Sequence, residues 1–134
     1  MEFNDERLGK LVVVAHCVLN QNSRVLGLAH YPAVIDEVVD ILGRYNIGFL
    51  QMPCPELTYA GAKRLGKTRE EYDTPSYRKH CRQIAASTAS QLEEFGKNNI
   101  KSIAVLGIEN SPSCGVSKLP DETGILMEEL AAEL

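Results

Sequence analysis

Residues 11–15, LVVVA, decide the fold, because they form a short run of apolar and mostly β-branched side chains that no polar residue interrupts. Residues 47–52, IGFLQM, and residues 102–108, SIAVLGI, resemble this run. Continuous apolarity, rather than alternation with polar residues, is typical of strands that are covered on both faces. The sequence therefore predicts three buried strands.

Helical patterns lie between and after these strands. The first is expected to begin near Pro32 and to end at Gly43, and the second to begin at Thr74 and Pro75 and to end at Gly96. A third, rich in Glu and Leu, is expected over residues 123–134. Because strands alternate with helices, the pattern predicts an α/β fold, a small three-layer α/β/α arrangement with a mostly parallel sheet of three or more strands, Rossmann-like or flavodoxin-like.

The bulk composition indicates a single domain over residues 1–134, with 44% hydrophobic and 24% charged residues. A formal net charge of -4 argues against stable nucleic-acid binding, which depends on neutralising phosphates. The polar start, MEFNDERLGK, does not resemble a signal peptide, and no apolar run approaches the roughly 20 residues of a membrane span. We therefore expect a cytoplasmic protein with no membrane partner. Basic clusters at residues 63–69 and 78–82 are expected to be solvated.

Three of the four cysteines follow the predicted strands. Cys17 comes directly after the first strand, Cys54 lies two residues past the second, and Cys114 lies six past the third. Parallel strands end at one edge of a sheet, with neighbours about 4.8 Å apart, so these thiols are expected to converge there. The fourth, Cys81, falls on the apolar stripe of the second helix and is expected to pack as a small hydrophobe.

Three interpretations of the converging thiols stay open on pattern alone. The thiols would hold an iron–sulfur cluster with one iron left open, or a zinc ion with a water as fourth ligand, or they are three unrelated core cysteines. No CxxC spacing points to a zinc knuckle or a redox pair. Long loops at residues 17–31 and 53–73 leave the same edge of the predicted sheet, where open parallel sheets bind ligands.

The blocks around these cysteines resemble a known family. AHCVLNQNSR at residues 15–24, CPE at residues 54–56 and SPSCG at residues 111–115 are similar to the thiouracil desulfidase (TudS) family, over residues 11–116. The resemblance implies an oxygen-sensitive [4Fe-4S] cluster on Cys17, Cys54 and Cys114, and a non-redox removal of sulfur from a thiolated pyrimidine such as thiouracil. Close members carry a CLLG-type first block and an Arg-Tyr-Asp-Gly turn, so this chain resembles a divergent, desulfidase-related branch.

Carried over by motif position, Glu56 and Ser111 are the expected catalytic residues. We expect Glu56 to accept a proton from the attacking water and Ser111 to orient the substrate, although each residue type also caps loops and turns. The expected substrate-binding residues are His16, Asn20, Asn22 and Ser113.

The functional hypothesis is therefore a desulfidase acting on a small thiolated molecule. Two alternatives are a non-catalytic iron–sulfur or sulfur-carrier module and a zinc-binding hydrolase. Relatives in the resembled family often add a strand after the last helix, so the sheet is expected to be either smaller here or completed by a partner chain in a homodimer.

Overall fold

The computed structural model describes residues 3–117 and 122–134, and its centre is one parallel sheet. Strand β1 (Lys10–Val14) lies between β2 (Gly48–Gln51) and β3 (Lys101–Leu106) and pairs in parallel with both. In this register Val13 stands between Leu50 of β2 and Val105 of β3. The three predicted strands are confirmed, and all of them end at the same edge.

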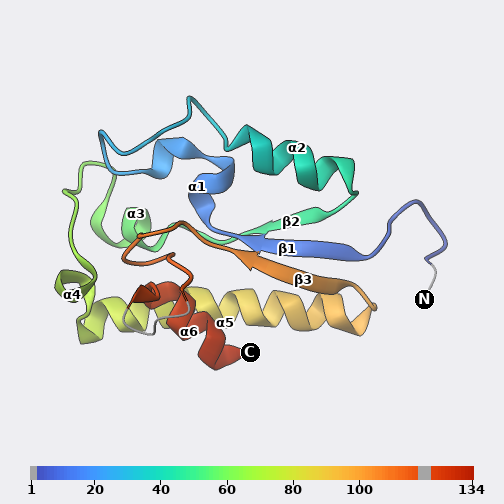
Figure 1. The fold of residues 1–134 in the computed structure, drawn as a ribbon. Helices are drawn as coiled ribbons and strands as arrows, with labels where there is room; N and C mark the ends of the chain where they lie inside the picture. The colour runs from blue at the N-terminus through green and yellow to red at the C-terminus, as the bar shows by residue number, and fades with distance from the viewer. Residues whose placement is uncertain (1–2, 118–121) are drawn as a thin grey trace.

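Helices lie on both sides of the sheet (Figure 1). Helix α2 (Asp36–Arg44) lies on one side, and α5 (Pro75–Lys97) and α6 (Ile125–Glu133) lie together on the other. Four short helical elements lie in the remaining described chain: α1 (His16–Leu19), the 3-10 turn η1 (Gln21–Ser23), α3 (Pro55–Ala60) and α4 (Arg69–Tyr72). The predicted small α/β fold is thus confirmed. The two segments predicted as long loops contain these short helices.

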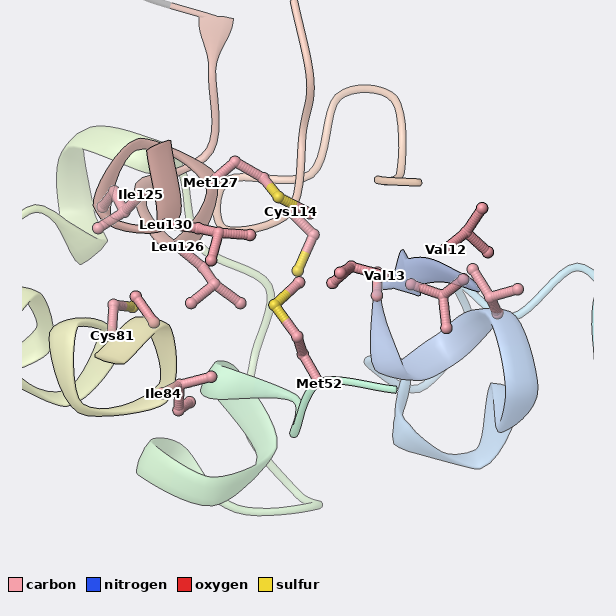
Figure 2. Packing of buried hydrophobic residues seen from close by; sticks show 14 of the residues in the cluster. Val12, Val13, Met52, Cys81, Ile84, Cys114, Ile125, Leu126, Met127 and Leu130 are labelled. Atoms are coloured by element: carbon pink, nitrogen blue, oxygen red, sulfur yellow. The ribbon is translucent and has the colours of Figure 1, made fainter. Parts of the chain in front are cut away.

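The hydrophobic core lies between β1 and the α5–α6 pair. Residues 11–14 of β1 are buried, as are Cys81 and Ile84 of α5. Figure 2 shows Met52 and Cys114 between β1 and the apolar side chains of α6. Burial raises the pKa of the Cys81 thiol to about 12, so Cys81 packs as the small hydrophobe that the helical stripe predicts. None of the helices in the described segments has the length and apolarity that crossing a bilayer requires.

Helix α5 begins where its sequence signals place it. Thr74 Oγ1 accepts a hydrogen bond from the Tyr77 N–H (3.2 Å), and Pro75 occupies the first turn, where its missing N–H costs nothing. Helix α2 instead begins at Asp36, four residues after the predicted start at Pro32. The Ile35 N–H donates to the Val18 carbonyl of α1, the helix that carries Cys17. This bond holds the residues before Asp36 against α1, so they do not join α2.

Strand β3 differs from the prediction that all three strands are covered on both faces. Its first four residues are exposed, and Ile103 is 51% exposed. The reason is topological, since among the described residues β3 pairs with β1 alone and is therefore an edge strand. A continuous apolar run does not distinguish such an edge from a central strand.

An ionic cluster joins the helices on one side of the sheet. Arg78 of α5 donates to Asp73 Oδ1 (2.8 Å) and to Glu128 Oε2 of α6 (2.9 Å), and Arg69 of α4 pairs with the same two carboxylates. Arg82 pairs with Glu129 of α6. Arg69 and Arg78 therefore differ from the expectation of solvated side chains, because they are largely covered and pair with the protein's own acidic residues, whereas the Arg82 side chain is 55% exposed.

The ion pairs of Asp73 should make the free energy of unfolding depend on pH in the acidic range. Hydrogen bonds from Arg78 hold the pKa of Asp73 below its ordinary value, so the folded-state pKa lies below the unfolded one. Such a group contributes stability above the unfolded pKa, about 3.9, and loses that contribution as pH falls through the folded pKa. In urea unfolding followed by circular dichroism between about pH 6 and about pH 2.5, Asp73→Asn should therefore show a flatter profile than the wild type.

The matched control is Asp40→Asn, on the exposed side of α2. Identical acid profiles for Asp73→Asn and the wild type would contradict the assignment.

Candidate functional site

Cys17, Cys54 and Cys114 line one cavity beyond the carboxyl ends of the strands. The cavity has a volume of about 360 Å³, within the range of small-molecule sites. The predicted convergence of the three thiols is therefore confirmed. The polar and charged side chains that share the lining are His16, Ser23, Arg24, His30, Glu56, Arg64, Glu109, Asn110 and Ser111.

Each cysteine is held by a different local structure. Cys17 lies in α1, which starts two residues after β1 ends. Cys54 is the N-cap of α3, and its sulfur accepts a hydrogen bond from the Leu57 N–H (3.4 Å). Cys114 lies in a turn closed by a hydrogen bond from the Ile108 N–H to the Cys114 carbonyl (2.9 Å).

The turn that carries Cys114 also requires close backbone contact with α6. The N–H groups of Ile125 and Leu126 donate to the carbonyls of Pro112 and Ser113, each at 3.0 Å. A Cβ on Gly124 would lie 2.3 Å from the Ser113 carbonyl, so only glycine permits this approach. The first N–H groups of α6, which lack intrahelical partners, are thus satisfied by the cysteine turn itself.

Burial disfavours the thiolate forms of Cys17 and Cys114. Burial raises the pKa of Cys114 well above its ordinary value, and the neighbouring Cys54 and Cys17 add to the effect. Burial also raises the pKa of Cys17, although the positive charge of the nearby Arg24 guanidinium opposes the shift. Binding of a metal group to these sulfurs would therefore release protons.

The donor set consists of three soft sulfur atoms, the type of ligand that both iron–sulfur clusters and zinc accept. Within residues 3–117 and 122–134, no group of three or more His, Cys, Asp or Glu side chains forms a site for one metal ion. A cubane makes a different demand, because each thiolate binds its own iron and the sulfurs need only surround a common space. Cys17, Cys54 and Cys114 line one cavity, so the chemistry of these donors fits such a group.

Glu56 is a buried carboxylate at the wall of the cavity, with only 8% of the residue exposed. Ser113 Oγ donates to Glu56 Oε2 (2.8 Å), while Tyr72 OH and Arg64 Nε donate to Oε1, each at 3.4 Å. Burying a charge is costly unless it is paired and hydrogen-bonded, and here both oxygens have donors.

The hydrogen bonds behind Glu56 have a fixed direction. Tyr77 OH lies 2.6 Å from Ser113 Oγ. Because the Ser113 hydroxyl uses its one proton toward Glu56, Tyr77 must be the donor in this second bond. Burial raises the pKa of Tyr77, which keeps the phenol protonated, and burial with the Glu56 charge raises that of Tyr72 to about 12. Every contact thus directs a proton toward the carboxylate.

The residues predicted from the sequence fall into two groups. His16, Glu56 and Ser111 line the cavity with the three cysteines. Ser111 Oγ accepts from the N–H groups of Ser113 (3.3 Å) and Cys114 (3.0 Å), so it also caps the cysteine turn. His16 Nδ1 lies 3.2 Å from the Met52 carbonyl, which can only accept, so Nδ1 carries the proton and leaves Nε2 as the acceptor of the neutral ring.

Asn20, Asn22 and Ser113 lie outside the cavity lining. Asn20 Oδ1 accepts from the Asn22 backbone N–H (3.1 Å) and side-chain amide (3.0 Å) and so caps η1. Ser113 is 1% exposed, and its hydroxyl is fully used between Tyr77 and Glu56. Ser113 therefore hydrogen-bonds Glu56 from the protein interior and does not line the cavity.

Several residues of the site were missed by sequence reasoning. The sequence predicts a solvated position for Arg64 and does not indicate that Tyr77 or Gln21 takes part in hydrogen bonds around the site. Gln21 is buried, and its amide bridges the Cys17 carbonyl (2.8 Å) and the His30 N–H (3.2 Å). Tyr72, in the segment that follows CPE, packs on Tyr77 with ring centroids 4.6 Å apart.

Comparison with known proteins identifies a relative. The chain is 46% identical over 125 residues to the uncharacterized protein MJ0003 of Methanocaldococcus jannaschii, a match that covers 93% of this chain and 78% of the archaeal protein. The chain belongs to the MJ0003 family. No family model and no solved structure matches it. The relative's name states no activity, so a function for the MJ0003 family has to be argued from the site.

The Ser113 hydroxyl should matter for stability. Ser113→Ala leaves the Tyr77 hydroxyl and Glu56 Oε2 without a buried partner, and one unsatisfied buried group typically costs about 1–3 kcal/mol. We expect a loss of that size in the free energy of unfolding, measured by urea denaturation. Ser87→Ala, on the exposed face of α5, is the matched control and should change stability by no more than about 0.5 kcal/mol. Equal effects of the two changes would contradict the network.

Proposed function

We propose that this member of the MJ0003 family is a desulfidase that removes sulfur from a thiolated pyrimidine or a related thioamide. The observation that carries the proposal is the meeting of three cysteines from three strand ends in one cavity, beside a buried carboxylate whose two oxygens are both held by donors. The similarity of the cysteine-containing blocks to thiouracil desulfidases supports the same assignment.

The cofactor of the proposal is a [4Fe-4S] cluster held by the thiolates of Cys17, Cys54 and Cys114. When bound, such a cluster would leave one iron without a protein ligand, and that iron would supply a soft Lewis acid for the sulfur of the substrate. All four cysteines are free thiols, which suits the reducing environment of the cytoplasm, where we place the protein.

Glu56 is the general base of the proposed reaction. The overall change is hydrolytic: water supplies the oxygen that replaces sulfur on carbon, the sulfur leaves as hydrogen sulfide, and no electrons are gained or lost. Glu56 accepts a proton from the attacking water, and its hydrogen bonds to Ser113, Tyr72 and Arg64 fix where that proton is taken. A well-placed base of this kind contributes typically about 10²–10⁴-fold to the rate.

Two further residues of the cavity wall have proposed roles. The Ser111 oxygen accepts two backbone N–H bonds, which leaves its own proton free to donate to a ring nitrogen or carbonyl of the substrate. His16 presents the acceptor nitrogen of a ring fixed by the Met52 carbonyl and would receive the proton that Glu56 has taken.

The first test is chemical composition and activity without oxygen. After anaerobic reconstitution with iron and sulfide, the wild type should hold about four irons and four acid-labile sulfides per chain and should release sulfide from 2-thiouracil or a related thioamide. Cys114→Ala should lose the brown colour and the activity, because one of three ligands is gone. Cys81→Ala is the matched control, a buried thiol away from the cavity, and should keep both.

The outcomes separate the rival functions. A colourless protein that binds zinc would replace the proposal with a zinc-binding hydrolase. A brown protein that releases no sulfide from any thiolated compound would favour an iron–sulfur or sulfur-carrier module.

The second test isolates the base. Glu56→Gln keeps the size and one acceptor oxygen of the side chain but removes its ability to take a proton. We expect kcat for sulfide release to fall about 10²–10⁴-fold with the iron content unchanged. Glu109→Gln, a second carboxylate of the cavity lining, is the control and should retain most activity. Full activity of Glu56→Gln would remove Glu56 from the mechanism.

A further inference from the structure

Arg64 joins three segments of the site through one side chain. It lies between α3 and α4, and only 5% of its side chain is exposed. Nη2 donates to the Ser23 carbonyl (2.8 Å), Nη1 donates to the Gly61 carbonyl (3.1 Å), and Nε donates to Glu56 Oε1 (3.4 Å). Ser23 belongs to the segment that follows Cys17, and Glu56 follows Cys54 by two residues.

The distances indicate what holds the guanidinium. The two bonds to backbone carbonyls are shorter than the bond to the carboxylate, so the main chain sets the orientation of the group. Because the guanidinium is planar and its N–H groups have fixed directions, placing both Nη atoms also fixes where Nε points. Glu56 then takes its position from Arg64 and Tyr72 on one oxygen and from Ser113 on the other.

We propose that Arg64 is a positioning residue, which orients the Glu56 carboxylate toward the thiol cavity. The inference rests on the proposed function, since it concerns the base of that reaction. The carbonyls of Ser23 and Gly61 hold the guanidinium, and the guanidinium in turn orients Glu56. A positive charge without this geometry would not orient the carboxylate.

A lysine separates positioning from charge. Lysine keeps the positive charge but is a single ammonium centre without a planar fork, so it does not reproduce the three bonds. If Arg64 only neutralised Glu56, Arg64→Lys would behave like the wild type. If it positions Glu56, Arg64→Lys should lose activity although charge is conserved, because a misplacement of about 1 Å can cost about 10²-fold in rate.

The experiment compares Arg64→Lys, Arg64→Gln and Arg64→Ala with Lys63→Gln, an exposed neighbour in the same segment. All are reconstituted anaerobically and assayed for iron content, kcat and KM on 2-thiouracil or whichever thioamide the wild type uses. We expect kcat to fall about 10–10²-fold for Arg64→Lys and further for Arg64→Gln, with KM within about threefold and about four irons retained. Guanidinium ion should restore part of the kcat of Arg64→Ala, and Lys63→Gln should match the wild type.

A double variant tests whether Arg64 acts through Glu56. Groups that act as a unit are strongly non-additive, so Arg64→Lys should cause no further loss of kcat in a Glu56→Gln background. The Glu56→Gln, Arg64→Gln variant also removes the unpaired buried carboxylate, and it keeps the comparison possible if Arg64→Gln alone does not fold.

Each outcome has one meaning. Wild-type activity in Arg64→Lys, loss of iron in the Arg64 variants, or additive losses in the double variant would overturn the positioning role while leaving the desulfidase intact. A wild type that holds four irons and releases no sulfide would overturn the proposed function, and the Arg64 inference with it.

Discussion

Parallel pairing of β1 with both of its neighbours is the constraint on which the site depends. Parallel strands run in one direction, so the three segments that follow them leave at the same edge although they are far apart in sequence. Cys17 and Cys54 each follow a strand end by three residues and Cys114 follows one by eight, and all three reach a common cavity. An antiparallel β1–β3 pair would have placed Cys114 at the opposite edge from Cys17, and no shared site would exist.

The buried carboxylate imposes a second constraint. Removing Glu56 from water is unfavourable unless both oxygens are hydrogen-bonded, and the donors come from separate segments, with Tyr72 in α4 and Ser113 in the cysteine turn. Satisfying one side chain therefore requires these segments to close around it together. The energetic need to solvate the charge and the chemical need to orient it are met by the same contacts.

The sequence predicted features that follow from topology and local signals, and it failed where long-range side-chain directions decide. Thr74 and Pro75 mark the start of α5 correctly, and the thiols converge because only strand direction matters. The start of α2 was misplaced because the Ile35 N–H bonds to Val18, a contact that no local pattern contains. The roles of Arg64 and Tyr77 could not be predicted from the sequence either, because a loop arginine and a helix tyrosine reach the site only once the chain has folded.

The seating of α6 on the cysteine turn has a consequence for how the protein fails. The first N–H groups of α6 donate to the carbonyls of Pro112 and Ser113. The backbone at Gly124 lies so close to Ser113 that no side chain fits between the helix and the turn. Heat or an interface substitution that released α6 would strip those carbonyls of their donors and free the loop that carries Cys114 in the same event. Melting of α6 and inactivation would then follow a common time course, because a change that releases this helix would also displace Cys114 from the cavity.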